Sequence, residues 1–156
     1  MGNRNSTKLL AVQEELPIEL PLDGSRVELL RLCVPDEYVG RTIKLDGFFQ
    51  SNFFVVDLDL SDEDQVLLPY KYELAFQVMA ADEALNLTPA SPILLDTVSG
   101  VQQPVEFTVE HNTSPNFTLS LPFVTGDLIL MANVLESQGG VAGAFVNARA
   151  LNATIF

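Results

Sequence analysis

The side chains best suited to binding a metal ion lie in an acidic segment at residues 57–64. This segment places six oxygen-bearing side chains within eight residues. Calcium takes about six to eight oxygen ligands, mostly from flexible loops. The spacing is not that of an EF-hand, because an aspartate stands where that loop requires glycine. Two interpretations remain, a charged loop that caps a sheet edge, which is favoured, and a calcium site formed by Asp57, Asp59, Asp62 and Asp64.

Two other side chains could react, the sole cysteine, Cys33, and the sole histidine, His111. Cys33 lies within the apolar run at residues 29–34, so a buried, inert thiol is the favoured interpretation and an intermolecular disulfide is the alternative. His111 precedes a turn-like sequence, and a solvated turn histidine without a catalytic partner is expected. The sequence contains no CxxC, no HExxH and no Gly-rich phosphate loop. We therefore predict that the chain is not an enzyme and that it needs no cofactor apart from the possible calcium.

An alternating segment near the N-terminus has the period of an extended strand. Its apolar side chains share one side, and Pro17 and Pro21 stand on the other side. Proline cannot donate to a ladder, so this segment is expected at a sheet edge or as an extended arm. The apolar side is predicted to pack on the same domain or on a neighbouring subunit. The candidate interface residues are Leu16, Ile18, Leu20 and Leu22.

The net charge of −13 limits the classes of partner. Residues 72–148 contain no lysine or arginine, so no basic stripe for nucleic acid exists there. Anionic membrane surfaces are disfavoured for the same reason. No apolar run approaches the ~18 residues that a membrane span requires, and no secretory signal is seen at the N-terminus. Neither nucleic acid nor membrane insertion is expected.

The remaining chain is a series of short strand-like runs separated by turn residues. Strands are expected over 26–34, 41–49, 52–60, 65–79, 93–98, 105–110, 116–123, 128–135 and 144–156. No segment has convincing helical periodicity. This spacing is typical of a β-sandwich, jelly roll or barrel. The predicted fold class is an all-β jelly-roll sandwich with an extended arm, divided into an arm at residues 1–25 and a domain at residues 26–156.

Two stretches together resemble a known family. Residues 17–21 lead into Arg26-Val27-Glu28-Leu29, and residues 117–120 continue through Gly126-Asp127 to a close at residues 148–156. The pattern is similar to the TNF/C1q-like jelly-roll domains of bacterial spore-surface proteins, the BclA-type exosporium domains and the endospore-appendage subunits. The resemblance implies trimers or fibres, with some subunits linked through an N-terminal arm. This chain lacks the collagen-like repeats and the cysteine-rich connector of those proteins.

Three functions follow from these observations. The leading hypothesis is a structural subunit of an extracellular or spore-surface fibre, at the cell or spore surface. Its partners would be copies of itself, in a homotrimer or a filament, with the arm adding a strand to a neighbour. The first alternative is a virion structural protein, such as a decoration or fibre protein. The second is a calcium- or carbohydrate-binding, lectin-like module.

Overall fold

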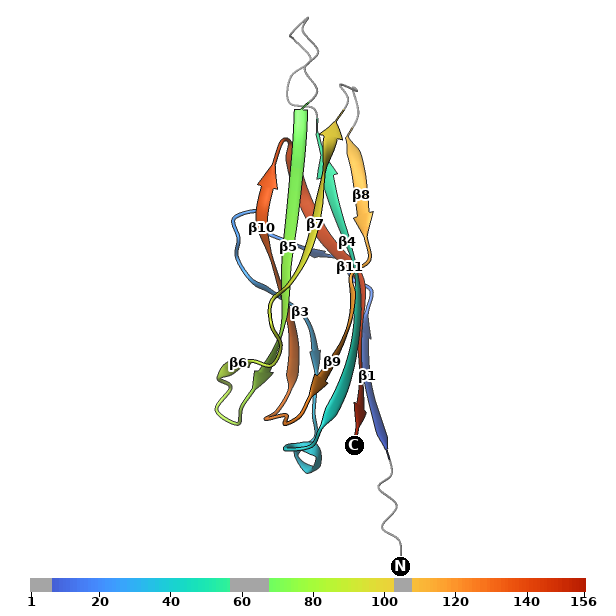
Figure 1. Ribbon diagram of the computed structural model, residues 1–156, viewed down its shortest axis with the longest axis vertical. Coiled ribbons are helices and arrows are strands. Elements are labelled where there is room, and N and C mark those ends of the chain that lie inside the picture. The colour runs from blue at the N-terminus through green and yellow to red at the C-terminus, as the bar shows by residue number, and fades with distance from the viewer. Residues whose placement is uncertain (1–6, 57–67, 103–107) are drawn as a thin grey trace, which may run out of the picture.

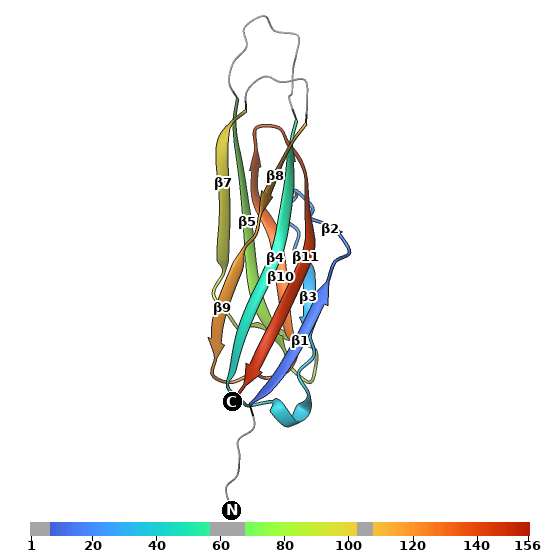
Figure 2. The same cartoon turned by 90° about the vertical axis from the view of Figure 1, so that its right-hand side faces the viewer.

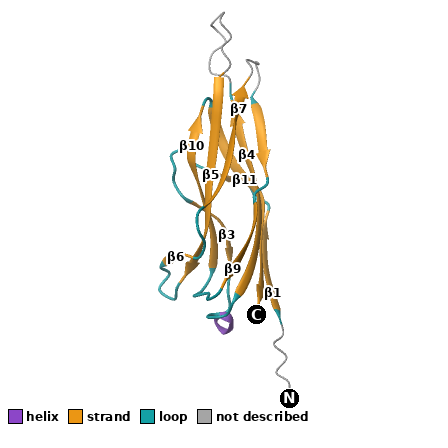
Figure 3. Cartoon of the chain, in the orientation of Figure 1, coloured by secondary structure: helices purple, strands orange, loops and turns teal. Residues whose placement is uncertain are grey.

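The computed structural model describes residues 7–56, 68–102 and 108–156, and these residues form two packed antiparallel sheets (Figure 1). One short 3-10 helix, η1, spans Asp36–Tyr38 and is the single coiled element in the described residues (Figure 3). No helix in this part of the chain is long and apolar enough to cross a membrane. The strands are β1 (Lys8–Glu14), β2 (Ile18–Glu19), β3 (Val27–Leu32), β4 (Ile43–Val55), β5 (Leu68–Ala81), β6 (Leu87–Pro89), β7 (Leu94–Gln102), β8 (Val109–Thr113), β9 (Asn116–Leu121), β10 (Leu128–Gln138) and β11 (Val141–Ile155).

The strand order is that of a jelly roll. In the first sheet β11 and β4 are central, β1 and β2 share one edge, and β8 and β9 share the other. In the second sheet β10 and β5 are central, β3 forms one edge, and β6 and β7 share the other (Figure 2). When each shared edge is taken as one interrupted strand, each sheet has four strands and the chain crosses between the sheets as two Greek keys. The prediction of an all-β jelly-roll sandwich is confirmed.

The core lies between the sheets and follows the period-two alternation of the strands. On β4, Phe49 and Phe53 are fully buried, and so are the residues at both ends of the strand. Phe49 meets Phe76 of the opposite sheet edge to face, with ring centroids 5.1 Å apart. Burial of each such side chain contributes roughly 1.5–3 kcal/mol, so the alternating apolar residues account for the pairing of the two sheets.

Several strands extend beyond the ranges that the sequence indicated. The runs predicted at 41–49 and 52–60 form one strand, β4, because Ser51 is buried and paired with Val146 on one side and Thr113 on the other. The strand predicted to end at residue 98 continues to Gln102. Gly100 permits this, because a Cβ there would lie 2.5 Å from the hydroxyl oxygen of Tyr70.

The N-terminal segment belongs to the sandwich. All seven residues of β1 pair with β11, from Lys8 opposite Ile155 to Glu14 opposite Arg149. β2 continues along the same edge, with Ile18 opposite Val146. This differs from the predicted division at residue 25, which treated the segment as an arm apart from the domain. The physical reason is that Leu10 and Val12 of β1, for which no strand was predicted, pack against the core.

Candidate functional site

The four predicted interface residues of the N-terminal segment have different environments. Leu20 is 1% exposed in the core, and its backbone N–H donates to the carbonyl of Ala144 at 2.9 Å. Ile18 and Leu22 are half-buried and pack against the same core. Leu16 is 74% exposed. The sequence predicted one shared apolar side, but only Leu16 is free to contact a neighbour, because the other three are held by their own domain.

The Arg149 side chain binds the segment that connects β1 to β2. The register of β11 against β4 shifts between Val146 and Arg149, and the Arg149 side chain is buried at this irregularity. Its guanidinium donates to the carbonyl oxygens of Leu29 at 2.5 Å, Leu16 at 2.6 Å and Asn147 at 2.9 Å. Burial lowers its pKa, and the charge of Glu14 acts in the opposite direction. Arginine stays protonated in proteins, so this is a buried cation that binds backbone carbonyls.

The buried position of Arg149 was not predicted from the sequence. One signal was present, since it is the sole basic residue beyond Lys71 and lies among small apolar residues. Its role became visible only when β3, β11 and the β1–β2 corner were brought together in space.

The calcium candidates Asp57, Asp59, Asp62 and Asp64 lie outside the described residues. Within residues 7–56, 68–102 and 108–156, no group of three or more His, Cys, Asp or Glu side chains could hold a metal ion. The calcium interpretation stays a prediction.

Cys33 is an exposed, free thiol. The favoured expectation of a buried cysteine is therefore wrong. It follows β3 directly, and its neighbours Leu32 and Val34 take the buried positions on either side of it. Alternation along the extended chain turns the thiol outward. An intermolecular disulfide through Cys33 stays a prediction.

His111 lies within β8, so the expectation of a turn histidine is also wrong. It pairs with Phe53 of β4, and the two rings stack with centroids 4.9 Å apart and planes 15° apart. Phe53 in turn stacks on Tyr72 at 4.4 Å, and Tyr70 lies 4.9 Å from the His111 ring. Among the described residues, no hydrogen bond joins His111 to a hydroxyl or a thiol. The histidine is part of an aromatic stack between the sheets.

A small polar cluster lies beside this stack. The Ser51 and Tyr72 hydroxyl oxygens are 3.5 Å apart, and both residues are fully buried. Burial raises the pKa of Tyr72 most, and the negative charge on Asp96 adds to the rise. Within the described part of the chain, two side-chain atoms, Oδ2 of Asp96 and Oγ1 of Thr113, are buried without a hydrogen-bond partner. Unsatisfied polar atoms cost free energy, so this polar cluster contributes less to stability than the apolar core.

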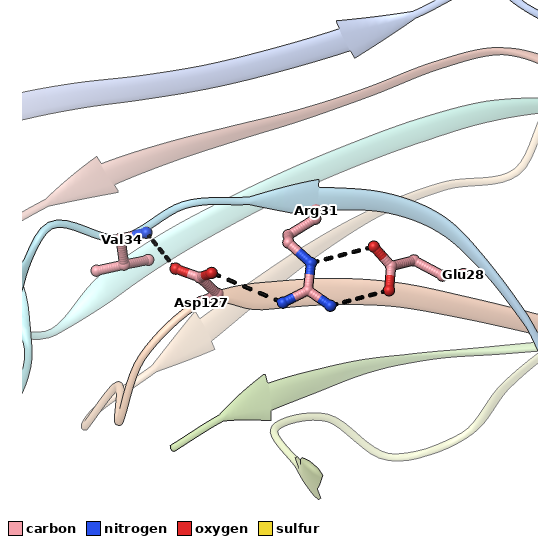
Figure 4. Close-up of polar contacts among 4 residues, drawn as sticks. All are labelled: Glu28, Arg31, Val34 and Asp127. Carbon is pink, nitrogen blue, oxygen red and sulfur yellow. Dashed lines mark hydrogen bonds and ion pairs between the residues drawn. The ribbon is translucent and has the colours of Figure 1, made fainter. Parts of the chain in front are cut away.

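A surface network fixes the start of β10 against β3 (Figure 4). Arg31 makes two hydrogen bonds to Glu28, at 3.1 and 3.0 Å, and lies 3.7 Å from Asp127. Asp127 also accepts the backbone N–H of Val34 at 3.0 Å. The exposed charges contribute little to stability by themselves. These contacts connect β3 to the residue that precedes β10, so the network has a structural role.

The C-terminus, helix η1 and the connection between β9 and β10 lie at one pole of the sandwich, and each carries an exposed apolar side chain at or next to it (Figure 1). Val39 is 41% exposed, Phe123 67% and Phe156 56%. They come from distant segments that are bonded together, since Gly40 donates to the carbonyl of Val124 and Phe156 donates to that of Thr42. We call Val39, Phe123 and Phe156 the terminal pole. Clustered exposed apolar residues are typical of a protein contact surface.

A second exposed apolar surface follows β7. Leu95 and Val101 are 57% and 56% exposed, and among the residues that the structure describes β7 has a strand partner, β5, on one side only. In Figure 2 this strand forms the outer margin of the second sheet. The described residues therefore offer two candidate assembly surfaces, the terminal pole and the β7 edge.

No family model matches the chain, and no curated protein matches it. Solved structures that are similar include infectious bursal disease virus strain Gx, at 10% identity and a TM-score of 0.49, covering 97% of this chain and 33% of that one. The VP2 subviral particle of the same virus matches at 9% identity and a TM-score of 0.46, covering 97% of this chain and 33% of that one. This chain spans about a third of the length of those proteins.

The fold and the surfaces define a class, a jelly-roll β-sandwich with exposed apolar surfaces. That assignment depends on the strand order of this chain. The resemblance to spore-surface proteins stays a prediction, because none of the comparisons tests it.

Proposed function

We propose that this chain is a structural subunit that assembles with copies of itself into a shell or particle. The terminal pole carries the proposal. Three large apolar side chains lie exposed there on a frame of backbone hydrogen bonds, and their burial against another molecule would remove apolar surface from water. Such a frame is rigid enough to give a repeated contact of defined shape.

The structure favours contacts between folded surfaces over linking by an arm. β1 and β2 occupy an edge of their own sandwich, and three of the four apolar residues predicted for the arm are held there. A fibre built by strand addition of this segment would first have to remove it from β11. We therefore prefer the hypothesis of a virion structural protein, which needs only contacts between folded surfaces, to that of a spore-surface or extracellular fibre.

The test is sedimentation velocity and negative-stain microscopy of the full chain across the micromolar range. We expect assembly that increases with concentration and a repeating particle in micrographs. A single monomeric species throughout would overturn the proposal.

Two serine variants separate the pole from the arm. Phe123→Ser should weaken assembly, because it removes the most exposed apolar ring of the pole. Leu16→Ser is the matched control, since Leu16 is similarly exposed and is the available residue of the predicted arm. Loss of assembly with Leu16→Ser but not with Phe123→Ser would restore the arm hypothesis.

A carbohydrate-binding module is the second candidate, favoured by the outer face of the first sheet. Asn147 donates to the Asn52 side chain at 2.7 Å, and Asn52 donates to Glu110. The Phe54 and Phe145 rings pack edge to face nearby on the same strands, 5.9 Å apart. Amide groups beside aromatic rings suit sugar hydroxyls and ring faces. A glycan array with the wild-type chain and Asn52→Ala tests this, and no binding by either protein would exclude it.

A further inference from the structure

The edges of the two sheets are not equally protected against pairing with another chain. Native edge strands are commonly blocked by charges, prolines, bulges or short length. β1 carries Lys8 and Glu14 at its ends, and β3 has six residues and a bulge at Leu29, which is skipped in the pairing with β10. The edge formed by β8 and β9 is interrupted at residues 114–115, which include a proline.

The β7 edge lacks all of these protections. It runs for nine residues with a regular register against β5 and contains no proline, lysine or arginine. Its single charged residue is Asp96, whose Oδ2 atom is buried inside the sandwich. A long, nearly uncharged edge strand is a template for another strand.

The side chains that β7 exposes form a palindrome. The exposed positions alternate with half-buried ones, and in chain order they are Leu95, Thr97, Ser99 and Val101. The apolar residues are thus at the two ends and the hydroxyl residues are in the middle. Such an order is unchanged in chemical type when the strand is reversed, which is the property an antiparallel pair of identical strands needs.

We propose that two copies of this chain pair through β7, antiparallel, about a two-fold axis at Val98. This inference depends on the proposed self-assembly and names one of its contacts. In this register Leu95 lies opposite the partner's Val101, and Thr97 lies opposite the partner's Ser99. Asp96 lies opposite the partner's Gly100, so the two carboxylates do not meet. A shift of the pairing by two residues would set Leu95 opposite serine or Val101 opposite threonine.

The neighbouring strand extends the match. Thr97 pairs with Glu73 of β5 and donates to its carboxylate at 3.1 Å, and Ser99 pairs with Lys71. A row across the seam therefore has Glu73 at one end and the partner's Lys71 at the other, with hydroxyl groups between them. The next row is apolar from Ala75 through Leu95 to the partner's Val101. Each row joins residues of compatible chemistry, and the two sheets would form one continuous sheet.

Two double variants test the register. In Leu95→Lys with Val101→Lys, lysine would face lysine at both symmetric positions of the seam. In Leu95→Lys with Val101→Glu, each lysine would face the partner's glutamate. Both variants change the same two exposed side chains, so they are matched in lost apolar surface. Circular dichroism and thermal unfolding establish that each variant folds.

Sedimentation equilibrium measures the dimer dissociation constant. We expect the lysine–lysine variant to dimerise at least about tenfold more weakly than the lysine–glutamate variant, because like charges directly opposite each other are destabilising and opposite charges attract. Equal dissociation constants for the two variants, whether near the wild-type value or both weakened, would overturn the β7 pairing. These outcomes differ from failure of the proposed function. A wild-type chain that stays monomeric would overturn the proposed self-assembly. A wild-type chain that assembles, with equal dissociation constants for the two variants, would overturn only the β7 pairing.

Discussion

Arg149 on β11 donates from its guanidinium Nε to the backbone carbonyl oxygen of Leu29 on β3, across the two sheets of the sandwich. The same guanidinium holds the carbonyl of Leu16, where the chain passes from β1 to β2. One side chain therefore joins three segments of the fold, at the place where the pairing of β11 is irregular.

Substitution of this arginine is expected to destabilise the protein strongly. Arg149→Met leaves the buried Leu29 carbonyl without a donor, and an unsatisfied buried group costs about 1–3 kcal/mol, so we expect a total loss of about 2–4 kcal/mol. Urea unfolding measures the change. Arg41→Met is the control, because its bond to the Phe156 carbonyl is exposed and its loss should cost under about 1 kcal/mol. Equal effects for the two variants would contradict this role of Arg149.

Thr113→Val is expected to leave stability unchanged or raise it by up to about 1 kcal/mol. The Thr113 hydroxyl is buried without a partner, and a methyl group of similar size removes that cost. Thermal unfolding compares this variant with Thr118→Val. The Thr118 hydroxyl donates to Asp46 at 2.6 Å, so its removal should lower the stability. A Thr113 variant less stable than the Thr118 variant would show that the hydroxyl has a partner in solution.

Gly126→Ala should destabilise the turn that precedes β10. A Cβ at Gly126 would lie 2.0 Å from the backbone carbonyl oxygen of Ala81, and backbone cannot move as a side chain can. Overpacking of this kind costs about 1–3 kcal/mol. Gly143→Ala is the matched control, because its nearest neighbours would lie at 3.6 and 3.8 Å, and its change should stay within about 0.5 kcal/mol. Chemical unfolding of both variants decides the point.

Alkaline pH should destabilise the fold through Tyr72. Burial raises the pKa of Tyr72 above its ordinary value near 10, so the folded protein keeps a proton that the unfolded chain releases. The unfolded state then binds fewer protons, and the free energy of unfolding falls as the pH rises above about 10. Urea unfolding between pH 9 and pH 11, about one unit either side of that value, should show a steeper fall for wild type than for Tyr72→Phe. Parallel curves would mean that Tyr72 ionises as easily in the folded state.

The Cys33 thiol should react in the native protein. Because it is exposed, an aromatic disulfide reagent should modify it without denaturant, at a rate within about tenfold of that of the unfolded chain. Absorbance of the released thiolate gives the rate, and Cys33→Ser provides the blank. Reaction only after unfolding would mean that Cys33 is covered, either by its own chain or in an assembly, and sedimentation at the same concentration distinguishes the two.

The all-β class and most strand positions could be predicted from the sequence, because alternation of apolar and polar residues is a local property. The strands predicted at 116–123 and 144–156 are present as β9 and β11. Errors arose where a local polar residue suggested a break, as at Ser51, or where a turn-like sequence followed, as at His111. In both cases pairing with neighbouring strands outweighed local preference.

Only the tertiary structure decided which edges remain open, and with them the candidate assembly surfaces. The sequence by itself determined the alternation that gives β7 its palindrome, but not that β7 has a partner on one side only. Likewise, it determined an apolar N-terminal segment but not that this segment packs on its own domain. Hydrophobic periodicity specifies which side of a strand is buried. Which strands become neighbours depends instead on contacts between residues far apart in the chain, and no local sequence pattern contains that information.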